Sequence, residues 1–157
     1  QLGYQSENAT WRNAYLLAAQ ELRNGIRAGR PIGFLRGDML PALATEVVFD
    51  FLGIRLMAEK AAGLHWRVEW HFTDRGEVVA QNLENATLTQ RIGRGHAAPH
   101  ARITTTRAAF DRVVAGSARF AVIVAAGDAR VEGDAALPAA LFDLLAVFQL
   151  NFPVVTP

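Results

Sequence analysis

The histidines are the first residues whose spacing could support chemistry, because paired imidazoles bind zinc and act as acids and bases. His65 and His71 have the same parity in a segment that alternates polar and apolar residues, which predicts both on one face of a strand. Six strand residues separate them by about 20 Å, which excludes a shared metal ion. His96 and His100 have the i, i+4 spacing of a helical zinc pair, but Pro99 between them favours a polar loop.

The other patterns that commonly carry chemistry are absent or incomplete. There is no Gly-x-Ser-x-Gly nucleophile elbow, and Ser6 and Ser117 are predicted to cap helices. Asp128, Glu132 and Asp134 lack the spacing of a helix-loop-helix calcium site, and Asp134 is also predicted to cap a helix. The chain has no cysteine and therefore no thiolate metal ligand. We expect no catalytic residue, no metal site and no other cofactor in this chain.

The composition is that of a folded domain, since 51% of the 157 residues are hydrophobic and 20% are charged. Sixteen basic and fifteen acidic side chains are mixed along the sequence, which disfavours nucleic acid as a partner. The richest apolar stretch, residues 120–126, is far shorter than the roughly 20 residues of a membrane span, so we expect a soluble chain. Because Gln1 begins neither a signal peptide nor an ordinary start, the natural N-terminus is expected elsewhere, and cytoplasm, periplasm and secretion stay open as locations.

The elements that must position these residues begin with a helix predicted over residues 10–26, where apolar residues recur at helical spacing. The residues able to cap its start are Ser6, Asn8 and Thr10. Its apolar surface points in more directions than one small neighbour would cover, which indicates part of a larger helical body. The glycine- and arginine-rich stretch 25–37 predicts a linker with a domain boundary near Gly33.

The remainder predicts an α+β fold with an antiparallel or mixed sheet of about five strands covered by helices. A helix is expected from Asp38 to Gly53, followed by alternation of apolar and polar residues over 54–59. Further strands are expected at 64–73, 77–83, 87–92, 101–105 and 129–132. Later helices are expected around Phe110 with Thr105 or Thr106 as cap, over 118–126 with Ser117 as cap, and from Asp134 to Phe148.

The last two predicted helices have more apolar surface than one sheet face can cover. In the first of them, residues 118–126, the only strongly polar residue is Arg119. In the second, after its cap, only Asp143 is strongly polar, and Gln149 follows directly after its end. The surplus predicts contact with an apolar ligand, a partner domain or a second subunit. A thick core is the alternative that involves no ligand.

Two groups of motifs carry a resemblance to a known family. The N-terminal block GYQSENATWRNAYL (3–16) with AQELRNG (19–25) resembles the end of the helical dimerisation domain of bacterial alkylsulfatases. The segments WRVEWHFTD (66–74), RVEGD (130–134) and NFPVVTP (151–157) resemble the sterol-carrier-protein-like domain that closes those enzymes. The resemblance therefore implies residues 1–32 as a terminal dimerisation helix with its linker, and residues 33–157 as a sterol-carrier-protein-like C-terminal domain.

The resemblance implies a homodimeric parent enzyme with a metallo-β-lactamase-like domain that holds two zinc ions. The zinc motif of the family, His-x-His-x-Asp-His, does not occur here, so hydrolysis is expected in missing N-terminal domains on which this chain packs. For the present residues it implies an apolar surface for the tail of a long-chain alkyl sulfate, such as dodecyl sulfate, or another apolar ligand. The expected tail contacts are Phe120, Ile123, Val124, Leu141, Leu145 and Phe148.

Two other functions remain open at this point. The chain could be an independent lipid or sterol carrier, although the block at 4–24 disfavours this because a free carrier does not need that helix. It could also be a structural module whose apolar helices pack on the parent enzyme and never meet a ligand.

Overall fold

A computed structural model of the protein describes residues 1–26, 39–148, 153 and 155. The chain forms two compact units, Gln1–Ile32 with Phe148–Pro157, and Gly33–Val147. The predicted linker at 25–37 and the predicted cap Asp38 lie almost wholly outside the described residues.

The first unit confirms the predicted N-terminal helix. A short helix α1, Leu2–Gln5, precedes α2, Ala9–Asn24. Of the possible caps, the structure selects Asn8, whose Oδ1 accepts hydrogen bonds from the backbone N–H groups of Thr10 at 2.9 Å and Trp11 at 3.2 Å. Gly25 ends α2 with a φ of 68°, a conformation that glycine adopts without strain.

The second unit contains the five-stranded sheet. The strands are β1 (Trp66–Phe72), β2 (Glu77–Glu84), β3 (Thr87–Ile92), β4 (Ala101–Thr105) and β5 (Ala129–Gly133). Their order is β3-β2-β1-β4-β5, with β1 and β4 parallel and the other pairs antiparallel, so the sheet is mixed. All five correspond to predicted strands, and the α+β fold class is confirmed.

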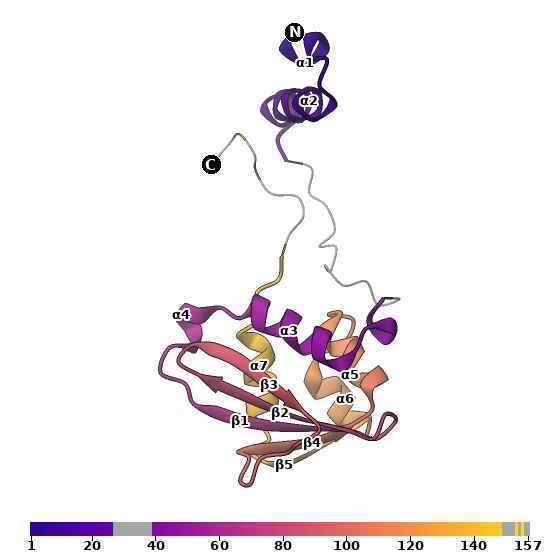
Figure 1. Ribbon diagram of the computed structural model, residues 1–157, viewed down its shortest axis with the longest axis vertical. Coiled ribbons are helices and arrows are strands. Elements are labelled where there is room, and N and C mark those ends of the chain that lie inside the picture. The colour runs from indigo at the N-terminus through magenta and orange to yellow at the C-terminus, as the bar shows by residue number, and fades with distance from the viewer. Residues whose placement is uncertain (27–38, 149–152, 154, 156–157) are drawn as a thin grey trace. The chain divides into compact units, whose positions relative to one another are not determined.

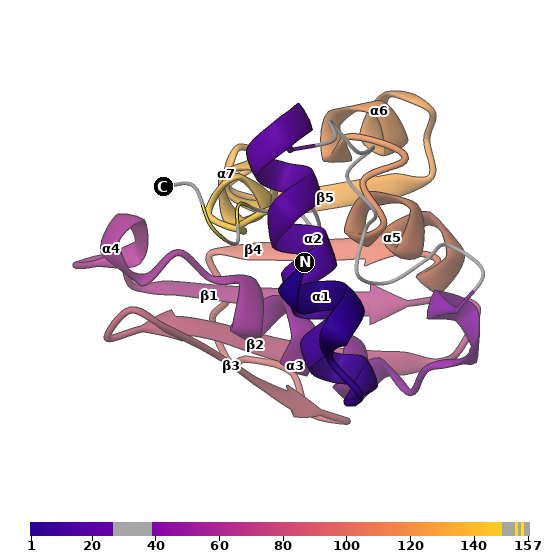
Figure 2. The same ribbon diagram turned by 90° about the horizontal axis from the view of Figure 1, so that it is seen from above.

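Helices cover one face of this sheet, as Figures 1 and 2 show. They are η1 (Leu40–Ala42), α3 (Thr45–Arg55), α4 (Ala58–Ala61), α5 (Arg107–Val114), α6 (Phe120–Ala125) and α7 (Leu137–Asp143). Between helices and sheet lies an aromatic core in which Trp70, Phe49 and Phe110 are almost wholly buried. Phe110 contacts both others, with ring centroids 5.0 Å from Trp70 and 5.2 Å from Phe49.

The alternation over 54–59 indicated a strand, but no strand forms there, because α3 continues through Gly53 to Arg55 and α4 begins at Ala58. Gly53 is therefore inside a helix and does not end one. A side chain there would place its Cβ 3.3 Å from the carbonyl oxygen of Leu88 on β3. Glycine thus serves the close approach of helix to sheet, which the helix-end interpretation missed.

The final helix is shorter than predicted, since α7 ends at Asp143. The residues after it form backbone hydrogen bonds with the end of α3: the Ala146 N–H donates to the Arg55 carbonyl at 2.7 Å, and Leu145 pairs with Leu56 as an isolated bridge. Arg55 also donates from Nε to the Ala146 carbonyl at 2.8 Å. These long-range hydrogen bonds replace helical ones. Leu145 and Phe148 are therefore not part of α7 and do not extend its apolar face.

The predicted helix caps have mixed outcomes. Thr106 caps α5, since its hydroxyl accepts from the Ala109 N–H at 3.1 Å. The prediction for Ser117 is wrong, because its hydroxyl donates to the Arg112 carbonyl at 2.9 Å and closes the preceding helix. The prediction that Asp134 caps the final helix is also wrong: Ala136 is at the N-cap of α7, and Asp134 accepts from the Ala136 N–H at 3.0 Å in a turn ahead of the helix.

Candidate functional site

The six residues predicted to contact an alkyl chain are distributed between the core and the surface. Val124 and Phe148 keep 38% and 41% of their surface exposed, and Phe148 belongs to the first compact unit. The four that are buried in the core of the second unit are Phe120, Ile123, Leu141 and Leu145. The structure therefore does not bring the six together on one accessible surface.

Phe120 shows why most of the six predicted contact residues are buried in the core. Its ring lies 6.2 Å from Trp70 in an edge-to-face arrangement and 6.0 Å from Phe142 in a stacked one. These centroid distances are within the range of favourable aromatic pairs. Phe120 thus joins the aromatic core above β1.

Exposed apolar side chains nevertheless remain on the helical layer. Helix α6 consists only of Phe, Ala, Val and Ile, with Phe120 and Ile123 facing the core while Val122 and Val124 are exposed. On α3, Val47 is 48% and Ile54 is 72% exposed. Part of the apolar surface expected for α6 is therefore exposed.

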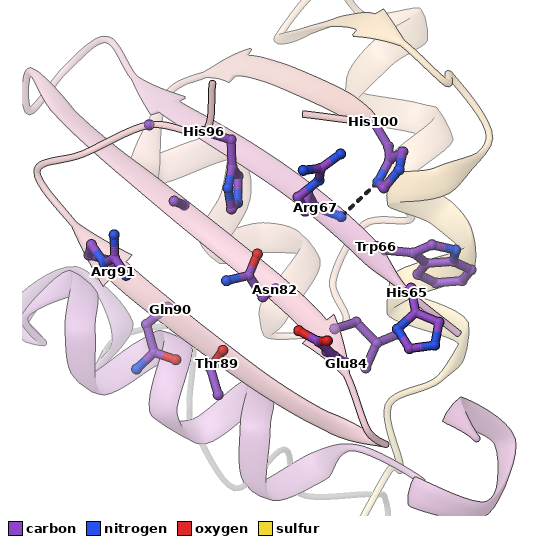
Figure 3. Close-up of a pocket in the computed structure, with 13 residues that line it drawn as sticks. His65, Trp66, Arg67, Asn82, Glu84, Thr89, Gln90, Arg91, His96 and His100 are labelled. Carbon is purple, nitrogen blue, oxygen red and sulfur yellow. Dashed lines mark hydrogen bonds between the residues drawn. The ribbon is translucent and has the colours of Figure 1, made fainter. Parts of the chain in front are cut away.

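A depression lies on the opposite face of the sheet, where polar side chains gather (Figure 3). Its volume is about 800 Å³. The loop at 93–100 crosses this face and forms one wall, with His96 and His100 at its rim. The polar or charged lining residues are His65, Arg67, Asn82, Glu84, Thr89, Gln90, Arg91, His96 and His100.

The loop is held to the sheet by the carboxylate of Glu69, which is only 3% exposed although it lies on the polar face. Glu69 accepts hydrogen bonds from Arg102 Nε at 2.7 Å, from the His96 N–H at 2.6 Å and pairs with His71 Nε2 at 2.6 Å. A Cβ at Gly95 would collide with the Glu69 carboxylate as it is placed, so glycine suits the close approach of the loop.

These contacts set the ionisation of the cluster. Burial alone would raise the pKa of Glu69, but the hydrogen bonds from His71, Arg102 and the His96 backbone, with the charge of Arg102, lower it to about 2. The same carboxylate raises the pKa of Arg102 above its ordinary value, chiefly through their hydrogen bond. Glu69 is therefore charged and fully engaged at neutral pH.

The alternation that placed His71 on the polar face of β1 also places Arg67 and Glu69 there, but sequence reasoning missed both the depression and the burial of Glu69. The alternation of β1 was a sufficient signal for the face. No local signal in the sequence indicates that the loop at 93–100 covers Glu69, because Glu69 and His96 are 27 residues apart.

Within the described residues, no three His, Asp or Glu side chains lie close enough together to hold a metal ion. His96 and His100 are in a loop, as predicted, and bond in different directions: His100 Nδ1 accepts from the Arg67 N–H at 2.9 Å, while His96 Nε2 lies 3.3 Å from the Gln81 carbonyl. None of the helices in the described part of the chain is long and apolar enough to cross a lipid bilayer.

The architecture defines a class of protein before any sequence comparison. A solved structure described as the UbiJ-SCP2 ubiquinone synthesis protein matches with a TM-score of 0.51 at 12% identity, over 62% of this chain and 91% of that one. At this identity the likeness concerns the fold alone. The second unit is thus an α+β domain of the sterol-carrier-protein-2 type.

Sequence comparison then identifies the family. The profile described as "Alkyl sulfatase C-terminal" matches residues 34–157, and the chain belongs to this family. The sec-alkylsulfatase Pisa1 from Pseudomonas sp. is 34% identical, with a TM-score of 0.82 over 98% of this chain and 24% of that one. The alkyl/aryl-sulfatase of Saccharomyces cerevisiae is 37% identical over all of this chain and 24% of its own length.

The relatives are much longer than this chain. It spans about a quarter of the length of the curated relatives that it matches, 23% of one and 24% of another. The family match confirms the resemblance to alkylsulfatases, and the structural matches confirm the sterol-carrier-like fold expected from the sequence.

Proposed function

We propose that this chain is a non-catalytic C-terminal part of an alkyl sulfate ester hydrolase and supplies an apolar surface for the alkyl chain of the substrate. The observation that carries the proposal is helix α6, which has no polar side chain and leaves Val122 and Val124 exposed beside a filled core. The relatives are named for alkyl and aryl sulfate esters, which combine a charged head with a hydrocarbon group.

The energetics of tail binding suit a surface that is separate from the chemistry. Each methylene that leaves water for an apolar environment contributes about 0.8 kcal/mol. A long tail can therefore supply binding energy to a reaction that takes place elsewhere in the same enzyme.

The exposure of individual residues sets an order among the proposed contacts. Val124 is accessible as the chain stands, and Val122 is exposed as well, about 200° around the helix from it. Phe148 is also exposed, in the other unit. The four buried residues, Phe120, Ile123, Leu141 and Leu145, become contacts only if α6 and α7 separate.

The proposal extends to the organisation of the parent protein. Residues 1–32 would be the last dimerisation helix with its linker, and 33–157 the sterol-carrier-like domain, in a homodimer whose catalytic domain holds two zinc ions. Two observations support the proposed domain boundary. The family match begins at residue 34, and the chain divides between Ile32 and Gly33. In the described structure the C-terminal residues from Phe148 group with the first unit, so the two divisions differ at that end.

A structural role is the second candidate. The burial of four of the six expected tail contacts favours it, because a core that is already filled leaves the helices free only to pack on a neighbouring domain. An independent carrier is less well supported, since the sulfatase relatives match the whole chain, including the N-terminal helix.

Displacement of a fluorescent fatty acid from the 157-residue chain by dodecyl sulfate below its micellar concentration tests the proposal. We expect saturable displacement, weakened about tenfold by the double change Val122→Ser with Val124→Ser, because less apolar area is buried. Ile92→Ser is the matched control, since Ile92 on β3 has the same 38% exposure as Val124. Circular dichroism verifies that the fold persists in the ligand.

Absence of binding at high micromolar ligand would reject the tail-binding role and favour the structural one. Equal weakening by Ile92→Ser would also reject α6 as the specific contact.

A further inference from the structure

Several side chains that line the depression on the polar face of the sheet are hydrogen-bond donors without an acceptor in the described part of the chain. Arg67, Asn82, Thr89 and Arg91 all line it. Among the residues that the structure describes, none of these four side chains makes a hydrogen bond or an ion pair. Unpaired guanidinium groups beside a cavity are suited to oxyanions, whose oxygens accept from their planar, multiple N–H groups.

The register of the sheet shows that the two arginines surround one point. Arg67 on β1 lies directly opposite Asn82 on β2, and Asn82 lies opposite Thr89 on β3. Arg91 is two residues further along β3, opposite Ala80. Two strand spacings and two residues separate the arginine Cα atoms by about 12 Å, so both long side chains can reach an ion above Asn82.

Figure 3 shows the same arrangement, with Asn82 between Arg67 and Arg91. The floor between the arginines is low because Ala80, which also lines the depression, has only a methyl side chain. His100 Nδ1 accepts from the Arg67 N–H, which holds the His100 ring at the rim of the depression.

Two carboxylates, those of Glu84 and Glu69, lie near the depression, but in the described structure neither forms an ion pair with Arg67 or Arg91. Glu84 is two residues along β2 from Asn82, toward His65 and away from Arg91 (Figure 3). Glu69 lies under the loop and is engaged by Arg102, His71 and the His96 N–H. Neither arginine forms an ion pair within the described part of the chain, so both guanidinium groups can bind an anion at the depression.

We propose that this depression binds a tetrahedral oxyanion, sulfate or phosphate, either free or as the head group of an ester, between Arg67 and Arg91 with Asn82 as the central donor. The volume of about 800 Å³ leaves space for the organic part of an ester. The site lies on the sheet face opposite the apolar helices, so it does not depend on the tail-binding proposal.

The test is an NMR titration of the 15N-labelled 157-residue chain with sodium sulfate, and in a second arm with sodium methyl sulfate. Sodium chloride at matched ionic strength is the reference for screening. We expect saturable shifts of the Asn82 side-chain amide and the Gly95 N–H. Arg67→Gln and Arg91→Gln should each weaken the affinity about tenfold, because each removes a charged hydrogen-bond donor.

Arg130→Gln is the matched control, because it removes one positive charge from β5, outside the depression, where the side chain is 80% exposed. It should leave the affinity unchanged. Saturation by both anions identifies an ester head group as an acceptable ligand, and saturation by sulfate alone identifies a site for the free dianion. Shifts that merely follow ionic strength, or equal weakening by Arg130→Gln, would overturn the proposal.

Discussion

At the scale of single residues, Glu69 combines a polar strand face with nearly complete burial. Removing a carboxylate from water is costly unless hydrogen bonds and an opposite charge compensate it. Arg102, His71 and the His96 N–H provide that compensation, and in doing so they tie the loop at 93–100 to β1. Glu69 therefore shapes the wall of the depression without facing it.

Glu69→Gln should destabilise the chain and reduce its acid sensitivity. The folded pKa of about 2 is below the ordinary value of 4.5, so the charge stabilises the fold above about pH 4.5, and this contribution is lost as pH falls toward 2. The shift corresponds to about 3 kcal/mol at neutral pH. Urea midpoints measured across this range check the expectation.

Glu132→Gln is the control for that experiment, because Glu132 is 51% exposed and lies 3.8 Å from the same Arg102. Its effect should stay within about 1 kcal/mol. A Glu69 variant whose midpoint tracked the parent chain at every pH would show that the carboxylate does not stabilise the fold.

At the scale of elements, a buried arginine fastens α5 to the segments that precede and begin α3. Arg107 donates from Nε to Asp111 Oδ1 at 2.7 Å, from Nη1 to Thr45 Oγ1 at 2.8 Å and from Nη2 to the Leu40 carbonyl at 3.1 Å. Its own backbone N–H donates to Asp74 Oδ1 at 2.7 Å. This network joins η1, the start of α3 and α5, the last of which packs over the aromatic core.

Arg107→Met should lower the free energy of unfolding by about 3–5 kcal/mol, because it leaves the Asp111 carboxylate buried without its cation. Arg112→Met on the same helix is the control, since Arg112 pairs with Asp128 while 50% exposed, and should cost about 1 kcal/mol or less. Thermal or urea unfolding of both variants gives the comparison. Similar losses of unfolding free energy in the two variants would show that the buried Arg107 network stabilises the fold no more than an exposed ion pair does.

At the scale of the whole molecule, the second unit has two unlike faces. One is the helical layer with exposed valines on α6, and the other is the polar depression with its unpaired arginines. The chain spans about a quarter of the length of its relatives, and both proposed surfaces belong to this part.

Because the proposed function assigns catalysis to other domains, we expect the chain by itself to release no sulfate from dodecyl sulfate, with or without added zinc. Ion chromatography of sulfate after prolonged incubation measures this. Turnover that stays with the purified chain, and disappears on heat denaturation, would contradict the assignment of catalysis to other domains.

The sequence by itself determined the elements whose signals are local. The alternation over residues 66–72 predicted the faces of β1, the breakers and turn residues marked the meander, and Asn8 and Thr106 were among the caps expected for α2 and α5. Motifs at both ends of the chain were also sufficient to indicate the family.

Only the tertiary structure decided which apolar residues stay accessible and where the polar site lies. Leu145 leaves the helical pattern because the backbone of 144–146 bonds to the end of α3, about 90 residues earlier. Glu69 is buried because a loop 27 residues later donates to it. Such outcomes depend on contacts between segments far apart in the sequence, and periodicity within a segment has no information about them.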